Sequence, residues 1–200
     1  LRIRLLHRNI EDMTNGVYDL IGDHETLVSG LTQYLSFLQN GDQYLTVSLP
    51  SFWYSGNIGI NGRFLTMNKL AAERGATIRR IFLITPKDKE NSEFKEMIKA
   101  HKNVIAELCS NGINTTKSER IAGGYYTAVK EIDNSTRDSM YRERKHFGLL
   151  IKKKKKIWIF PIYQKGNKDD ETVAAIQFRT KFDLERSILE TFSTLFRESM

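Results

Sequence analysis

The chain of 200 residues is 40% hydrophobic and 28% charged, a balance typical of one globular domain with an ordinary core. Its apolar runs reach only about four or five residues, too short for a membrane-spanning helix. The single cysteine excludes an internal disulfide and favours a cytoplasmic protein, and the net charge of +7 favours an anionic partner.

The polar start of the chain predicts little regular structure. Because the sequence opens on Leu1 and residues 7–23 are mostly polar, we expect residues 1–22 to be an N-terminal extension, the end of an upstream segment. Asp23 to Gln39 predicts an amphipathic helix, since its leucines recur at spacings of three and four.

The next stretch predicts the unit around which the domain is built. Tyr44 to Leu49 is a short apolar strand, and the glycine-containing residues 51–62 predict a loop. Arg63 to Arg74 has a helical period, Gly75 ends that helix, and Thr77 to Ile84 is a second apolar strand. Two apolar strands joined by a crossover helix indicate a parallel, buried sheet.

The remaining sequence predicts further helices and strands of the same domain. In order, they are a charged loop at Pro86–Glu90, a helix at Asn91–Ser110, strands at Ile113–Arg120 and Tyr125–Ile132, a loop or short exposed helix at Asp133–His146, a hairpin of Phe147–Ile151 and Ile157–Tyr163, a strand at Thr172–Arg179 and a helix from Asp183. No linker divides them, so we expect one domain over residues 23–200.

Aromatic residues follow the first predicted strand, where open α/β sheets bind ligands. Trp53 and Tyr54 come shortly after Pro50, at the carboxyl end of a strand expected to be parallel. They form the mouth of a candidate pocket, with Arg63 close in sequence. The alternative is that Trp53 covers the hydrophobic core.

Two arginines, Arg79 and Arg80, interrupt an otherwise apolar strand. An unpaired buried charge is costly, so at least one of them must reach a partner carboxylate or the edge of the sheet. A structural ion pair is one interpretation, and an arginine that binds an anionic ligand is the other.

Five consecutive lysines occupy the predicted tip of the hairpin. They are Lys152, Lys153, Lys154, Lys155 and Lys156. Such a run is typical of a solvated face. Five cations at one tip also repel each other, and an anionic surface such as nucleic acid or lipid would relieve that repulsion.

No motif for catalysis, a metal or a cofactor is present in the sequence. The four histidines stand in different neighbourhoods without HExxH, and neither GxSxG nor a P-loop occurs. The glycines of SGNIGING lack the spacing of a phosphate-binding loop and predict hinges. We therefore expect no metal and no cofactor.

Several segments share a common order with a known family. AERGATIRRIFLI (Ala72 to Ile84) ends a helix with Arg-Gly before an apolar strand, and Asn111-Gly112-Ile113 is similar to the next such step. Lys145–Phe160 and Val173–Phe196 follow as hairpin, strand and helix. Over roughly residues 23–198, this order resembles one half of the phospholipase D-like superfamily. The resemblance implies an α/β half-domain with a mixed, largely parallel β-sheet flanked by helices on both faces.

The resemblance also implies where catalysis would occur. In that family, a histidine attacks phosphorus, a lysine two residues later holds the phosphate oxygens, and an aspartate follows. Here His146 is followed by Gly148 and Lys153 in those places, so two of the three positions differ. This departure leaves an enzyme in doubt and favours a non-catalytic member. Family motifs from two halves or two subunits meet at one site, which leaves a homodimer open.

These observations support three hypotheses. The first is a non-catalytic phospholipase D-like sensing or interaction domain of a larger regulatory protein. It would bind a small or anionic ligand at the carboxyl edge of the sheet, near Trp53, Tyr54, Arg63 and His146. The second is a divergent phosphodiesterase or nuclease. The third, which is not favoured, is a nucleic-acid-binding module that uses the hairpin at residues 152–156.

Overall fold

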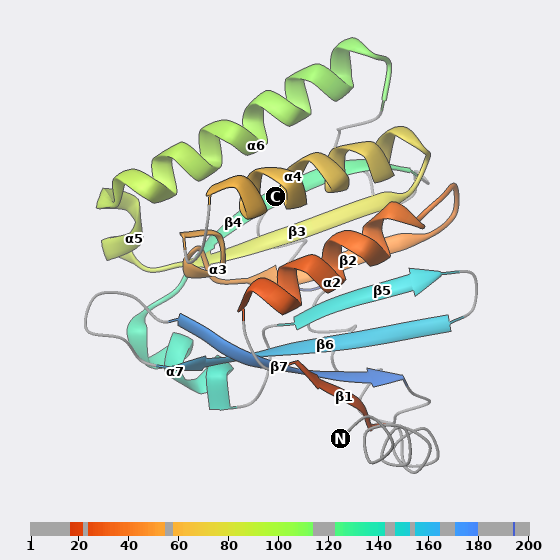
Figure 1. The fold of residues 1–200 in the computed structure, drawn as a ribbon. Coiled ribbons are helices and arrows are strands. Elements are labelled where there is room, and N and C mark those ends of the chain that lie inside the picture. The colour runs from red at the N-terminus through yellow and green to blue at the C-terminus, as the bar shows by residue number, and fades with distance from the viewer. Residues whose placement is uncertain are drawn as a thin grey trace.

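The computed structural model describes residues 17–21, 24–54, 58–113, 123–142, 147–152, 155–164, 171–179 and 194. Its strands form one seven-stranded sheet in the order β1-β7-β6-β5-β2-β3-β4. The strands are β1 (Val17–Ile21), β2 (Gln43–Ser48), β3 (Thr77–Ile84), β4 (Gly124–Glu131), β5 (Phe147–Lys152), β6 (Lys155–Gln164) and β7 (Glu171–Arg179). Figure 1 shows the sheet.

The sheet is mixed, as the sequence predicts, and the α/β fold class is confirmed. β2, β3 and β4 run parallel to one another. The other neighbouring strands pair antiparallel, so the parallel part is confined to one half of the sheet. The predicted hairpin is present as β5 and β6, whose pairing extends to Lys152 opposite Lys155.

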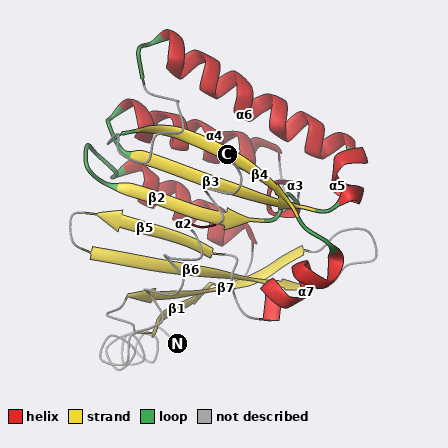
Figure 2. Ribbon diagram, turned by 180° about the vertical axis from the view of Figure 1, so that it is seen from behind, coloured by secondary structure: helices red, strands yellow, loops and turns green. Residues whose placement is uncertain are grey.

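The three long helices lie along one face of the sheet (Figures 1 and 2). The helices are α2 (His24–Ser36), α3 (Ser51–Tyr54), α4 (Ile58–Glu73), α5 (Pro86–Glu90), α6 (Ser92–Ser110) and α7 (Asn134–Arg142). α2, α4 and α6 are the long ones, and Figure 2 shows the sheet from its other side. The helix predicted from Asp183 and the strand predicted at Ile113–Arg120 lie outside the described residues, apart from Ile113 and Thr194.

β3 is buried along almost its whole length. Ile78 and Phe82 point toward the helices, and the alternate residues Ile81 and Leu83 point to the opposite face. All four are at most 1% exposed. The apolar run that predicts a strand buried on both faces is therefore confirmed.

The prediction that the N-terminal residues form an irregular extension was wrong for residues 17–21. Val17–Ile21 forms β1 and pairs antiparallel with β7, although we expected residues 7–23 to be irregular and residues 1–22 to lie outside the domain. The strand has only five residues and its partner lies more than 150 positions later in the chain. Local sequence carries no signal of such a distant pairing.

Two predicted loops are partly helical. Residues 51–54 form α3 and α4 begins at Ile58, so most of the expected loop at 51–62 is helix. Helix propensity is a weak guide where tertiary packing opposes it, and Phe52 and Trp53 are buried. α5 replaces the charged loop at Pro86–Glu90 because the Asp88 carboxylate accepts hydrogen bonds from the Thr85 backbone N–H and Oγ1.

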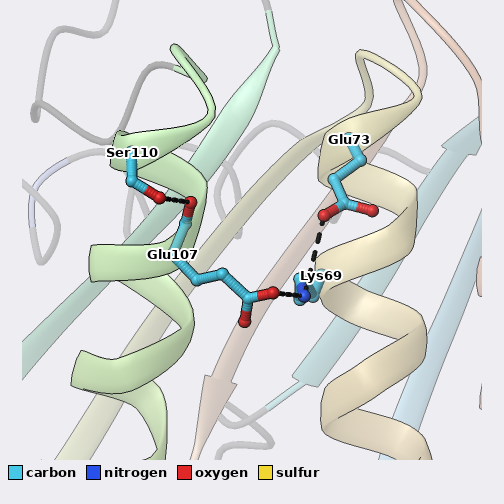
Figure 3. Close-up of polar contacts among 4 residues, drawn as sticks. All are labelled: Lys69, Glu73, Glu107 and Ser110. Atoms are coloured by element: carbon cyan, nitrogen blue, oxygen red, sulfur yellow. Dashed lines mark hydrogen bonds and ion pairs between the residues drawn. The ribbon is translucent and has the colours of Figure 1, made fainter.

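A charged contact joins two of the long helices (Figure 3). The Lys69 ammonium on α4 contacts the Glu107 carboxylate on α6 and lies 3.8 Å from a Glu73 carboxylate oxygen. Its hydrogen bond to Glu107 raises the pKa of Lys69. These side chains are partly exposed, so the contact orients α4 against α6 and contributes little to stability.

Substitution of Gly75 tests how the chain passes from helix α4 to strand β3. Its φ is +88°, and an added Cβ would lie 3.1 Å from Asn40 Cβ. Gly112 has a φ of +74° with nothing within 4 Å, which makes it a matched control. We expect Gly112→Ala to lose about 1–2 kcal/mol of unfolding free energy from backbone strain, and Gly75→Ala to lose more because of the contact. Urea unfolding midpoints measure both, and equal losses would contradict the packing explanation.

Candidate ligand site

The centre of the candidate site is a buried arginine on β3. Arg80 is 1% exposed. Its Nη1 donates a hydrogen bond to Tyr125 Oη over 3.2 Å, and its Nη2 donates to Asn68 Oδ1 over 3.1 Å. Both acceptors are neutral groups, so these hydrogen bonds satisfy donors without compensating the charge.

Aromatic rings surround the guanidinium. Its central carbon lies 4.5 Å from the ring centre of Trp53, 5.7 Å from those of Tyr44 and Phe64, and 6.0 Å from that of Phe82. Ring faces attract a desolvated cation by about 2 kcal/mol each at best. Within the described residues, Arg80 forms no ion pair with an acidic side chain. For Arg80, the structural ion pair that the sequence offered as one interpretation is therefore not formed within the described residues.

A histidine extends the hydrogen-bond network away from Arg80. His101 on α6 lies with Nδ1 2.7 Å from Tyr125 Oη, and its ring packs edge-on against Trp53. Burial, and secondly the charge of Arg80, hold the pKa of His101 well below its usual value. Burial also raises the pKa of Tyr125 to about 12. The network is thus one permanent cation among neutral partners.

The polarity of the hydrogen bonds follows from the chemistry of each group. Arg80 can only donate, so Tyr125 Oη accepts from it and can donate its own proton to His101 Nδ1. A neutral His101 then carries its proton on Nε2. Among the described residues this buried nitrogen has no hydrogen-bond partner, which leaves one polar group of the site available to a ligand.

Six elements that are far apart in sequence build this site. Tyr44 comes from β2, Trp53 from α3, Asn68 from α4, His101 from α6 and Tyr125 from β4. α3 follows the carboxyl end of β2, so the site lies toward the edge where ligands of parallel sheets bind (Figure 1). Sequence reasoning found Trp53 and Arg80 and missed the other four residues.

Two of the missed residues left a signal in the helical pattern. Asn68 lies four residues after Phe64, and His101 lies four residues after Met97, so each falls on the buried stripe of its helix. A polar residue on such a stripe must have a partner inside the protein. Tyr44 and Tyr125 lie in apolar strands and gave no comparable signal.

The other predicted site residues do not all meet at Arg80. Trp53 is 8% exposed and covers the core, as the alternative interpretation held. Arg79 lies on the opposite face of β3 and its guanidinium is 5.8 Å from the Tyr126 ring centre. Arg63 is exposed on α4. Tyr54 is the last residue of α3, and His146 lies outside the described residues.

The lysine run is described only in part. Lys152 is exposed at the end of β5, and Lys155 and Lys156 belong to β6. Lys153 and Lys154 lie outside the described residues. Within the described chain, no three His, Cys, Asp or Glu side chains gather to hold a metal ion. None of the helices in that same part is long and apolar enough to cross a membrane.

Comparison with known proteins gives weak structural similarity and no sequence match. The sequence matches no protein-family model and no curated protein. A structure of TrmBL2, an archaeal chromatin protein described with a novel mode of DNA binding, is 10% identical with a TM-score of 0.46. The match covers 99% of this chain and 61% of that protein. At this level of similarity it assigns neither family nor function.

The buried His101 predicts a pH dependence of stability. Its pKa is near 6.5 in the unfolded chain and far lower in the folded protein, so below about pH 6.5 only the unfolded chain binds the proton. We expect this residue to lower the unfolding free energy by up to about 1.4 kcal/mol per pH unit as pH falls below 6.5. Urea unfolding of the wild type and His101→Gln between pH 7.5 and 5 measures the difference, and parallel pH profiles would contradict it.

Proposed function

We propose that the chain is a non-catalytic, phospholipase D-like sensing or interaction domain that binds a small anionic ligand through Arg80. The observation that carries the proposal is a guanidinium with 1% exposure and no acidic partner among the described residues. Resemblance of the sequence order to the phospholipase D-like half-domain supports a regulatory role.

The charge balance of the site favours an anion. Removing a cation from water costs several kcal/mol, and neutral hydrogen-bond acceptors and aromatic rings offset this cost without neutralising the charge. A carboxylate or phosphate group would complete the compensation, because two of its oxygens match two guanidinium N–H groups. Tyr125 and Asn68 each use one nitrogen of Arg80 and fix the orientation of the remaining donors.

Trp53 controls access to the guanidinium. Its ring is the closest of the four aromatic neighbours and belongs to α3, a helix of only four residues. A helix this short has little stability of its own and depends on its packing. In the proposed mechanism, ligand binding displaces Trp53 and so changes the contact between α3 and its neighbours Phe64 and His101.

The enzymatic alternative rests on His146, where two of the three family positions differ. His101 does not replace it as a nucleophile, because it is buried and bonded to Tyr125. Hydrolysis of a generic phosphodiester that is lost in His146→Ala would establish an enzyme and overturn the non-catalytic proposal.

A screen of small carboxylates and phosphates by thermal unfolding tests the proposed ligand class. An anion present at about 100 times its Kd stabilises the folded state by about 2.7 kcal/mol, roughly 5–10 °C in Tm at this chain length. We expect Arg80→Met to abolish the shift and Arg63→Met, an exposed cation on α4, to preserve it. The fluorescence of Trp53, isolated in a Trp158→Phe background, should change saturably with the same anion.

Two results would overturn this proposal. One is a screen in which no anion raises Tm, and the other is an equal shift in the wild type and Arg80→Met. Should Arg80→Met fail to fold, Tyr125→Phe removes only one hydrogen-bond partner of the guanidinium. An unchanged affinity in that variant, with an unchanged Trp53 signal, would count against the site.

A further inference from the structure

An exposed aromatic residue lies against the lysine hairpin. Phe37 follows the last residue of α2 and is 55% exposed. The Lys152 ammonium, at the end of β5, lies 5.3 Å from the centre of the Phe37 ring. A cation on one face of an exposed ring leaves a surface that is aromatic and positively charged at once.

The surroundings of Phe37 add positive charge and little negative charge. Residues 33–41 contain no Asp or Glu, and the nearby Asp42 is 5% exposed with its carboxylate accepting the Gln39 backbone N–H. Arg74 reaches the same end of α2, where it donates hydrogen bonds to the carbonyl oxygens of Leu35 and Leu38.

The pairing of β5 with β6 continues this basic surface. Lys152 pairs with Lys155, and Ile151 pairs with Lys156. The start of β6 therefore places two further lysine residues beside the end of β5. Two more lysines join these strands in the sequence. The backbone of Lys152 and of its pairing partner Lys155 therefore lies at the end of the sheet where α2 and β5 finish (Figure 1).

We propose that Phe37 and Lys152, where β5 pairs with β6, form a binding surface for single-stranded nucleic acid. A base stacks on the Phe37 ring, and Lys152 contacts a neighbouring phosphate. Every base presents a flat face to an aromatic ring, and an unpaired strand makes that face accessible. A duplex keeps its bases stacked within the helix and offers only phosphates to this surface.

The exposed apolar residues favour a nucleic acid over a membrane. Phe37, Leu70 and Val129 are the large exposed hydrophobics among the residues whose side-chain exposure the structure describes, and they are far apart in the sequence. Membrane attachment requires a broad apolar face beside the cations, whereas stacking requires one accessible ring. The surface lies at the opposite end of the parallel strands from α3 (Figures 1 and 2), so this proposal does not rest on the Arg80 site.

Fluorescence anisotropy with a labelled single-stranded oligonucleotide tests the surface. We expect Phe37→Ala to weaken binding by about 5- to 150-fold, the usual effect of losing one base–aromatic stack. Lys152→Gln should weaken it by about fivefold at 0.1 M salt and reduce the magnitude of the log–log salt slope by about 0.7, as expected for one lost phosphate contact. A duplex of the same sequence should bind more weakly than the single strand.

Two control variants separate the effect of losing this surface from a general loss of positive charge or of stability. Val129→Ala removes an exposed apolar side chain on β4, and Lys102→Gln removes an exposed cation on α6. Both should bind like the wild type. Equal affinity in Phe37→Ala and the wild type would overturn the proposal, as would preference for the duplex. Binding to vesicles of anionic lipid without binding to the oligonucleotide would also overturn it.

Discussion

The described structure is built around a positive charge in its interior. Arg80 lies on the strand that is buried on both faces, and six elements supply the rings and hydrogen-bond acceptors around it. α3, α4 and α6 meet around this residue, because Trp53, Asn68 and His101 all contact it or its partner Tyr125. A buried charge held by neutral groups is a weak source of stability, which makes a role in binding the more economical explanation of its presence.

The sequence predicted the elements that have a strong local signal. β3 was predicted to the residue, because Thr77–Ile84 is mostly apolar and lies between Gly75 and Pro86. The long helix ending at Ser110 was predicted for the same reason, since its apolar stripe is regular and Asn91 begins it. β1 was missed because its strand partner within the described sheet is β7, a distant pairing that no local pattern reveals.

The site was less predictable than the fold. The interruption of an apolar strand indicated that Arg80 needed a partner, but the nature of the partner depends on residues brought together from distant elements. Asn68 and His101 could have been noticed as polar residues on buried helical stripes. The tyrosines could not, because a buried tyrosine in a strand is ordinary. The contact between Phe37 and Lys152 likewise joins the end of α2 to a strand more than a hundred residues later.

The central claim, that Arg80 is the cation that meets an anionic ligand, is tested most directly by NMR of ¹⁵N-labelled arginine side chains. The Arg80 signal is assigned by its loss in Arg80→Lys, and inorganic phosphate and acetate serve as first probes. We expect a saturable shift of the Arg80 Nε resonance, with the resonances of Arg63 and Arg74 unchanged. An Arg80 resonance that stays fixed while exposed arginines shift, or that moves with them in a non-saturating manner, would contradict it.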